Sequence, residues 1–164
     1  MIKAIVFDLD GTLIRLPVDY EQLFREFNKI TKTNTFHPVI KAISKLDEHT
    51  RKKVFKVWDN AELLASKKMT VNKEGMRIYK RYSQKPKALV TLQGRALVET
   101  ILKELDLTFT FTITRDDSLD RVEQLKIAVN KLKTEFQNVL FVGNSENDFS
   151  AAKEVGCQFS RVTI

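Results

Sequence analysis

Short apolar runs alternate with longer amphipathic stretches over most of the chain, and this alternation restricts the fold more than any other feature. Runs rich in Val, Ile, Phe and Thr predict five strands, at residues 2–7, 88–91, 108–113, 139–142 and 158–161. Apolar residues at helical spacing predict helices at residues 95–105, 119–133 and 148–155. Strands that alternate with helices in this way favour an α/β fold, in which a parallel sheet is covered by helices on both faces.

Helical spacing replaces the strand pattern between residues 17 and 84. We expect four short helices there, within residues 19–30, 37–46, 48–67 and 73–82, packed as a small bundle. Trp58 is in register with apolar neighbours, which predicts that it belongs to the core of this bundle. The stretch SQKPKA, with Pro86, predicts the return to the sheet. The expected organisation is therefore a sheet domain, residues 1–16 and 85–164, interrupted by an all-helical insert, residues 17–84.

The net charge of +7 comes from the helical insert. Residues 17–84 contain 15 Lys and Arg but only 8 Asp and Glu, and the two signs balance elsewhere. Scattered basic residues can simply be solvated helix faces, or they can form a positive field that attracts phosphate esters or nucleic acid. No aromatic stacking motif or known nucleic-acid module is present, so a nucleic-acid partner is not expected.

The cysteine, histidine and hydropathy patterns argue against an internal disulfide, a histidine metal site and a membrane-spanning segment. A single cysteine, Cys157, cannot form an internal disulfide, and neither His37 nor His49 has a companion at metal-ligand spacing. No apolar run approaches the roughly 20 residues needed to span a bilayer, and the first residues do not form a secretory signal. We therefore expect a cytoplasmic protein that does not bind membranes; monomer and homodimer both remain open.

Polar side chains follow the predicted strands at the edge where a parallel sheet gathers its chemistry. Asp8 and Asp10 come directly after the first strand, Thr91 ends the second, and Asn144 and Asp148 follow the fourth. Three carboxylates that converge there would repel one another unless a cation held them, and an all-oxygen ligand set suits Mg²⁺. Because Mg²⁺ binds through one or two carboxylates and substrate phosphate, the pattern predicts a metal and phosphate site.

These residues belong to motifs that resemble the haloacid dehalogenase superfamily. The motifs are DLDGTL, KALVT with Thr91, a basic residue after TRDDSLD, and VLFVGNSENDFSAAKEVG, in that family's order. The resemblance covers the sheet domain, and residues 17–84 lie where the family has a small helical cap. It implies a Rossmann-like three-layer fold with the strands, numbered along the chain, in the order 5-4-1-2-3. It also implies hydrolase activity similar to phosphoglycolate phosphatase and its relatives.

Carried over by position, the resemblance makes Asp8 the nucleophile, which would form an aspartyl phosphate that water then hydrolyses. Asp10 would be the general acid and base, and aspartate at this position is typical of phosphatases and phosphomutases. Gly11 would allow the sharp turn beside the nucleophile, and Thr12 would hydrogen-bond within that turn.

The remaining residues would bind the phosphoryl group and the metal. The Thr91 hydroxyl and a backbone N–H of Gln93 or Gly94 would donate to a phosphoryl oxygen. Mg²⁺ would be held by the Asp8 carboxylate, the Asp10 main-chain oxygen and Asp148. Inward-facing Lys and Arg of the cap would favour anionic metabolites as substrates.

The chain departs from the family pattern at two positions, and these departures leave alternatives open. The family's usual lysine is replaced by Arg121, or its role passes to Lys126 on the same helix. Asn144 replaces a common aspartate, which should weaken the metal site, although its amide oxygen can still accept a hydrogen bond. The main hypothesis is a Mg²⁺-dependent phosphatase for a small phosphate monoester. The alternatives are a phosphomutase or phosphotransferase, and a degenerate member that binds an acidic partner through its basic cap.

Overall fold

A five-stranded parallel sheet forms the centre of the molecule. The computed structural model describes residues 1–33 and 39–163, so the prediction for His37 and the first two residues of the helix expected within residues 37–46 lie outside the described residues. In space the strands run in the order β5 (Phe111–Ile113), β4 (Lys87–Val90), β1 (Ala4–Phe7), β6 (Val139–Gly143) and β7 (Gln158–Arg161). This order, with every neighbouring pair parallel, confirms the predicted sheet.

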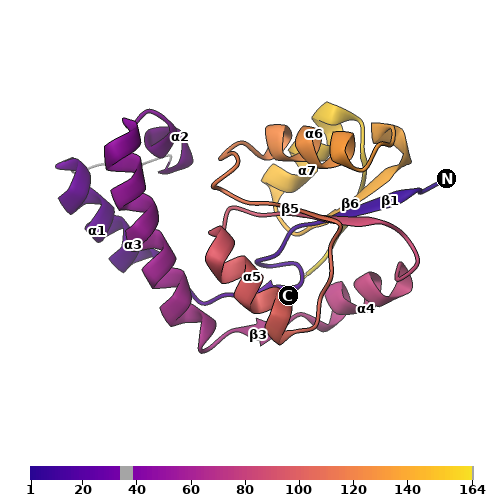
Figure 1. The fold of residues 1–164 in the computed structure, drawn as a ribbon, viewed down its shortest axis with the longest axis horizontal. Coiled ribbons are helices and arrows are strands. Elements are labelled where there is room, and N and C mark those ends of the chain that lie inside the picture. Colours follow the sequence, from indigo (N-terminus) through magenta and orange to yellow (C-terminus); the bar gives the residue numbers. More distant parts are fainter. Residues whose placement is uncertain (34–38, 164) are drawn as a thin grey trace.

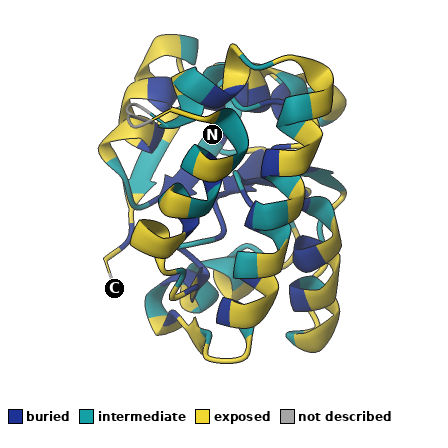
Figure 2. Cartoon of the chain, turned by 90° about the vertical axis from the view of Figure 1, so that its left-hand side faces the viewer, coloured by how far each residue is buried: buried dark blue, intermediate teal, exposed yellow. Residues whose placement is uncertain are grey.

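Helices cover both faces of the sheet and give it three layers (Figure 1). The side chains of β1 alternate between the two faces of the sheet. Ile5 and Phe7 pack toward α5 (Arg95–Glu104), whereas Ala4 and Val6 pack toward α6 (Arg121–Lys131) and α7 (Glu146–Val155). A 3-10 turn, η1 (Phe136–Asn138), leads into β6. All four β1 residues are buried, as expected for a central strand covered on both faces. Figure 2 shows the strands enclosed by helices whose outer sides are exposed.

Three helices form a separate layer beside the sheet domain, on the left of Figure 1. They are α1 (Tyr20–Thr31), α2 (Val39–Ser44) and α3 (Glu48–Ser66), and we call them the cap. Asp19 and Asp47 begin α1 and α3 because their side chains accept backbone N–H bonds from the first turn. Trp58 and Phe27 lie in the cap core, which confirms the prediction for Trp58. No helix in the described part of the chain is both long and apolar enough to cross a membrane.

The fourth expected helix forms, but the expectation that it joins the bundle was wrong. The helix α4 (Lys73–Arg81) packs on the sheet domain, where Met76 and Tyr79 contact the apolar cluster that contains Phe7. Helical spacing shows that a helix has an apolar face but not which neighbour that face meets, so the sequence could not separate the two arrangements. The division at residues 17–84 stays a prediction, within which α4 lies against the sheet.

A pair of short strands that the sequence did not predict joins the cap to the sheet domain. The two strands, β2 (Ile14–Arg15) and β3 (Thr70–Val71), are antiparallel and lie on the outgoing and returning links. Each has only two residues, which is too few to show the alternation by which strands are recognised.

Candidate active site

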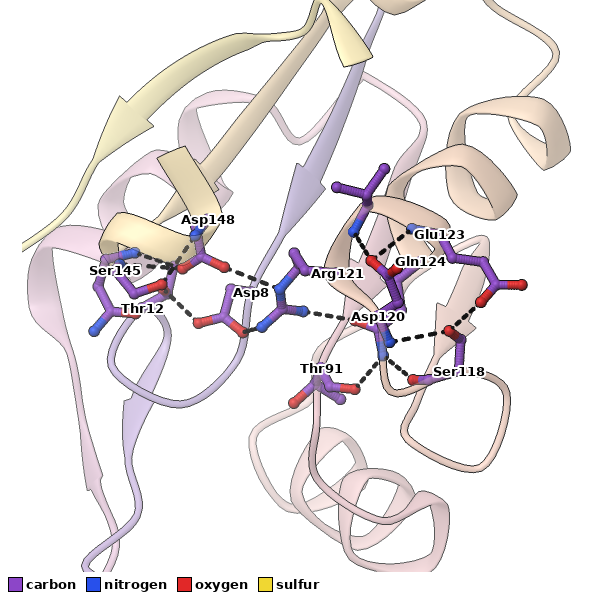
Figure 3. A network of polar contacts seen from close by, with 12 residues as sticks. Asp8, Thr12, Thr91, Ser118, Asp120, Arg121, Glu123, Gln124, Ser145 and Asp148 are labelled. Atoms are coloured by element: carbon purple, nitrogen blue, oxygen red, sulfur yellow. Dashed lines mark hydrogen bonds and ion pairs between the residues drawn. The ribbon is translucent and has the colours of Figure 1, made fainter. Parts of the chain in front are cut away.

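Asp8, Arg121 and Asp148 meet at the carboxyl ends of the central strands. Asp8 follows β1, Arg121 begins α6, and Asp148 lies in the first turn of α7 directly after β6. The Arg121 guanidinium pairs with both carboxylates: Nη2 is 3.0 Å from Asp8 Oδ1, and Nε is 3.0 Å from Asp148 Oδ1 (Figure 3). All three side chains are at most 8% exposed, so these ion pairs are largely shielded from water. Arg121 thus occupies the position expected of the basic residue.

Lys126 does not share that position. It is exposed on α6 and is not among the residues that line the pocket above Asp8. Arg121 therefore lies at the site and Lys126 does not, whereas the catalytic role of Arg121 stays a prediction.

Hydrogen bonds from the turn after β1 and to the neighbouring strand fix the position of Asp8. The Thr12 hydroxyl donates to Asp8 Oδ2 at 3.1 Å, and the Asp8 backbone N–H donates to the Val142 carbonyl. Gly11 has a φ of 87°, which glycine adopts without strain, and a β-carbon there would lie 2.2 Å from Asn144 Nδ2. The close approach places the Asn144 side chain against the turn that carries Asp8 and Asp10. The expected roles of Gly11 and Thr12 in shaping this turn agree with their contacts.

Asp10 is held at the rim of the same pocket. Its Oδ1 accepts the backbone N–H of Leu16 at 2.8 Å, which fixes the side chain relative to the start of the cap linker. Burial raises the pKa of Asp10, although hydrogen bonds from Leu16 and Gly11 and the charge of Arg15 oppose the shift. A carboxyl with a raised pKa is better suited to carry and release a proton near neutral pH.

The buried carboxylates outnumber the buried cation. Burial raises the pKa of Asp8 to about 7; the Arg121 charge opposes this shift, while Asp148 and Asp10 add to it. Asp148 is further held because Oδ2 accepts the backbone N–H groups of Asn144 and Ser145 at 3.2 and 3.1 Å. The site therefore has an excess of negative charge that an additional cation would relieve.

A residue that the sequence reasoning missed orients Arg121. Gln124 is fully buried, its Oε1 accepts from Arg121 Nη1 at 2.8 Å, and its Nε2 donates to the carbonyl oxygens of Thr91 and Ser118. Figure 3 shows this chain of contacts from Ser118 to Asp148. The signal available in the sequence was a glutamine three residues after Arg121 on an amphipathic helix, where the two side chains share a face.

The loop after β4 differs from the expected phosphate-binding arrangement. The Thr91 hydroxyl donates to the Gln93 side-chain oxygen and accepts the Gln93 backbone N–H at 3.2 Å. The Gly94 N–H donates to Glu62 Oε1 of the cap at 3.1 Å. Of these residues only Gln93 lines the pocket, so Thr91 or Gly94 would have to exchange partners to reach a phosphoryl oxygen. Their binding roles stay predictions.

A buried ion-pair cluster fastens the cap to this loop, and the sequence reasoning missed it. Arg115, which follows β5, has a fully buried side chain that pairs with Glu62 at 2.8 Å and with Asp59, both on α3. It also donates to the Leu92 carbonyl and lies 4.2 Å from the centre of the Trp58 ring. Burial raises the pKa of Glu62 to about 7, against the opposing charge of Arg115. Because the partners are more than 50 residues apart in the chain, no local pattern indicates them.

Asp8, Arg121 and Asp148 line a pocket of about 370 Å³ between the sheet domain and the cap. Its core side contains six of the predicted site residues: Asp8, Asp10, Gln93, Arg121, Asn144 and Asp148. Tyr20, Phe24 and Trp58 are among the cap residues on the opposite side. The structure therefore brings most of the predicted catalytic and metal-binding residues together under the cap.

The oxygen donors in this pocket fit a magnesium ion. Within residues 1–33 and 39–163, no three Asp, Glu, His or Cys side chains form a metal-binding group, so the donors must include other oxygens. The Asp10 carbonyl accepts no backbone hydrogen bond from the described residues, and the Asn144 side chain lies against Gly11, the next residue of the turn. Together with the Asp8 carboxylate they form a small all-oxygen set of the kind that Mg²⁺ completes with water and phosphate. Burial, with the charges of Asp148 and Asp10 in addition, raises the pKa of Asp8, and a bound cation would oppose this shift.

The fold and the pocket define a class of protein: a Rossmann-like α/β enzyme scaffold with an inserted helical cap over an acidic site at the strand ends. A family model for the haloacid dehalogenase-like hydrolases matches residues 5–162. The chain belongs to this family. Among curated proteins, no sequence match was found.

Solved structures share the fold at low sequence identity. A haloacid dehalogenase-like hydrolase from Streptococcus pneumoniae has a TM-score of 0.72 at 16% identity, covering 99% of this chain and 85% of that one. A protein assigned as a phosphoglycolate phosphatase from Lactobacillus plantarum has a TM-score of 0.68 at 20% identity, covering 96% and 84%. A protein assigned as a β-phosphoglucomutase from Thermotoga maritima has a TM-score of 0.64 at 16% identity, covering 99% of this chain and 86% of that one. These similarities establish the fold, which phosphatases and mutases have in common.

Proposed function

We propose that this hydrolase is a Mg²⁺-dependent phosphatase that cleaves a small phosphate monoester through an aspartyl-phosphate intermediate on Asp8. The observation that carries the proposal is the convergence of Asp8, Asp10, Arg121 and Asp148 in one pocket beneath the cap. A family of hydrolases with this fold and these motifs supports the same reaction class.

In the first step, an Asp8 carboxylate oxygen forms a bond to phosphorus while the ester P–O bond breaks. Asp10 gives its proton to the leaving oxygen, and the raised pKa of its carboxyl makes a protonated form available. Arg121 stabilises the ionised form of Asp8, because its guanidinium lies 3.0 Å from that carboxylate. In the second step, Asp10 takes a proton from water as water attacks phosphorus and Asp8 is released.

Magnesium would be held by the Asp8 carboxylate, the Asp10 carbonyl and the Asn144 amide oxygen, with Asp148 close by. When bound, it would neutralise the charge of the phosphoryl oxygens and help to orient them. Asp148 holds the backbone of Asn144 and Ser145 in place, which positions the amide beside the turn.

The experiment measures phosphate release from an aryl phosphate with Mg²⁺, with chelator, and with an Asp8→Asn variant. We expect turnover only in the first case, and turnover by Asp8→Asn equal to that of the wild type would refute the proposal. An Asn144→Asp variant should bind Mg²⁺ more tightly, since it restores a carboxylate. Thermal unfolding in a Mg²⁺ titration measures this without any need for activity.

A phosphomutase is the alternative that the shared fold leaves open. A mutase must bind a polar sugar as phosphoryl acceptor, whereas the described cap residues that line the pocket are mainly aromatic and aliphatic. The hydrolase is therefore preferred, and product analysis separates the two: a rearranged sugar phosphate without free phosphate would favour the mutase.

A further inference from the structure

The pocket above Asp8 has two walls of opposite chemistry. The core wall presents the charged and amide groups described above. Among the described residues, the cap wall has three aromatic and two aliphatic side chains: Tyr20, Phe24, Trp58, Val39 and Ile40. No Lys or Arg from the described part of the cap lines this pocket, although residues 17–84 contain the whole excess of positive charge. The expectation that inward-facing basic residues select anionic metabolites therefore finds no support in this wall.

The aromatic side chains of the cap wall are held by one another. The rings of Tyr20 and Phe24 are 5.8 Å apart, those of Phe24 and Phe27 are 6.1 Å apart, and Phe27 meets Trp58 edge to face at 5.9 Å. The Tyr20 side chain carries no charge near neutral pH, because a tyrosine phenol ionises only at about pH 10. The wall is thus an uncharged surface whose rings are already in place before a ligand arrives.

The cationic groups of the described cap lie outside this pocket, and the cation within it is already paired. Arg121, the cation on the pocket's core side, pairs with Asp8 and Asp148. Lys41 and Arg51 of the cap line an adjoining cavity of about 670 Å³, and Asp120 and Glu123 lie on its core side. A second anionic group that stays within the pocket above Asp8 would therefore meet the neutral cap wall and lose its hydration without gaining a partner.

We infer that the leaving group of the substrate is a small uncharged aromatic group that packs on the rings of Tyr20 and Phe24, with Trp58 beside them in the pocket wall. This inference rests on the proposed function, because it assigns the rest of the molecule whose phosphate lies at Asp8. A pocket of about 370 Å³ accommodates a phosphate and one ring system. Stacking on aromatic side chains favours a ring over a carboxylate of similar size by about tenfold or more.

The first test measures binding, so that it does not depend on turnover. Benzylphosphonate and phosphonoacetate share a non-hydrolysable methylene phosphonate and differ only in carrying a phenyl ring or a carboxylate. Trp58 is the single tryptophan of the chain and lines the pocket, so its fluorescence reports occupancy in the presence of Mg²⁺. We expect benzylphosphonate to bind at least about tenfold more tightly. Equal affinities, or tighter binding of phosphonoacetate, would overturn the inference.

Variants locate the preference on the cap wall. Tyr20 is 40% exposed at the first position of α1, so its replacement leaves the cap core intact. Tyr20→Ala should reduce the ratio of the two affinities about fivefold, whereas Tyr20→Phe should retain it, because the ring remains. The control is Leu64→Ala, a cap residue that is 69% exposed and lies outside this pocket. A ratio that Tyr20→Ala leaves unchanged would contradict the assignment of the wall.

Measurements of turnover distinguish a failure of this inference from a failure of the proposed function. Benzyl phosphate and phosphoglycolate are the matched esters, and kcat/KM should favour benzyl phosphate by about tenfold or more. If neither ester is hydrolysed while benzylphosphonate still binds preferentially, the phosphatase proposal fails and the assignment of the wall stands. If both are hydrolysed with equal kcat/KM, the phosphatase proposal stands and the assignment fails.

Discussion

Replacement of Gly75 by alanine should destabilise the protein and slow turnover, even though it favours the helix in isolation. Gly75 lies in α4, and a β-carbon there would come within 1.9 Å of the Thr12 carbonyl oxygen. Thr12 in turn donates to Asp8, so α4 packs directly against the turn that carries the candidate nucleophile. This substitution therefore tests the packing of α4 and its connection to the site together.

The magnitude follows from two opposing effects. Alanine improves helix propensity by about 1 kcal/mol. Relief of the contact requires a shift of roughly 1.5 Å between two backbone segments, since ordinary contact begins at 3.4 Å, and overpacking of this kind costs about 3 kcal/mol. The net loss is about 2 kcal/mol, which lowers Tm by about 4–8 °C for a chain of this size. Displacement of Thr12 by that amount should reduce kcat/KM by roughly tenfold to a hundredfold.

Thermal unfolding and aryl phosphate turnover measure both effects, with Gly156→Ala as the matched control. Gly156 has a φ of 87°, but a β-carbon there meets no atom within 4 Å. The control should therefore lose about 1 kcal/mol through backbone strain alone and keep its turnover. A Gly75→Ala variant that is as stable and as active as the wild type would refute the packing of α4 against the turn.

Two further predictions concern the buried charges. Arg121→Met should lower kcat/KM by at least about a hundredfold, and Arg121→Lys should lower it by less, since lysine keeps the charge. Replacement of the exposed Lys126 by alanine should leave kcat/KM unchanged. A larger loss of kcat/KM in Lys126→Ala than in Arg121→Met would assign the basic role to Lys126 instead. Burial raises the pKa of Glu62 from 4.5 to about 7, so the folded state retains a proton that the unfolded state has released, and stability falls as pH rises through this window. Glu62→Gln should remove this loss, and its stability relative to the wild type should rise by about 2 kcal/mol between pH 5 and pH 8 in denaturant titrations; a constant difference would contradict a buried, titrating Glu62.

Local sequence patterns were sufficient to predict the parallel sheet and the residues that follow its strands. The central strand shows itself as an unbroken apolar run, and the aspartates that follow it must lie at the carboxyl edge because all neighbouring strands are parallel. This constraint brought Asp8 and Asp148 together correctly although 140 residues separate them. It did not decide between Arg121 and Lys126, because both lie on one helix and only its packing shows which of them faces the site.

Contacts between distant segments could not be predicted from one chain. The helix α4 has the same kind of apolar face as a cap helix, yet that face meets the sheet domain. Arg115 and Glu62 look like ordinary charged residues in the sequence, and only the approach of α3 to the loop after β4 makes them a buried pair. The neutral character of the cap wall could likewise not be predicted from the sequence, because the basic composition of the cap does not show which side of each helix carries the charged residues.

Covalent labelling of Asp8 tests the central claim most directly. Wild-type protein with Mg²⁺ and an ester that carries radioactive phosphorus is quenched in acid within one turnover, and its peptides are separated. We predict an acid-stable, hydroxylamine-sensitive label on the peptide that contains Asp8, absent from the Asp8→Asn variant and from protein treated with chelator. Turnover without any label on that peptide, undiminished in Asp8→Asn, would contradict the assignment of Asp8 as nucleophile.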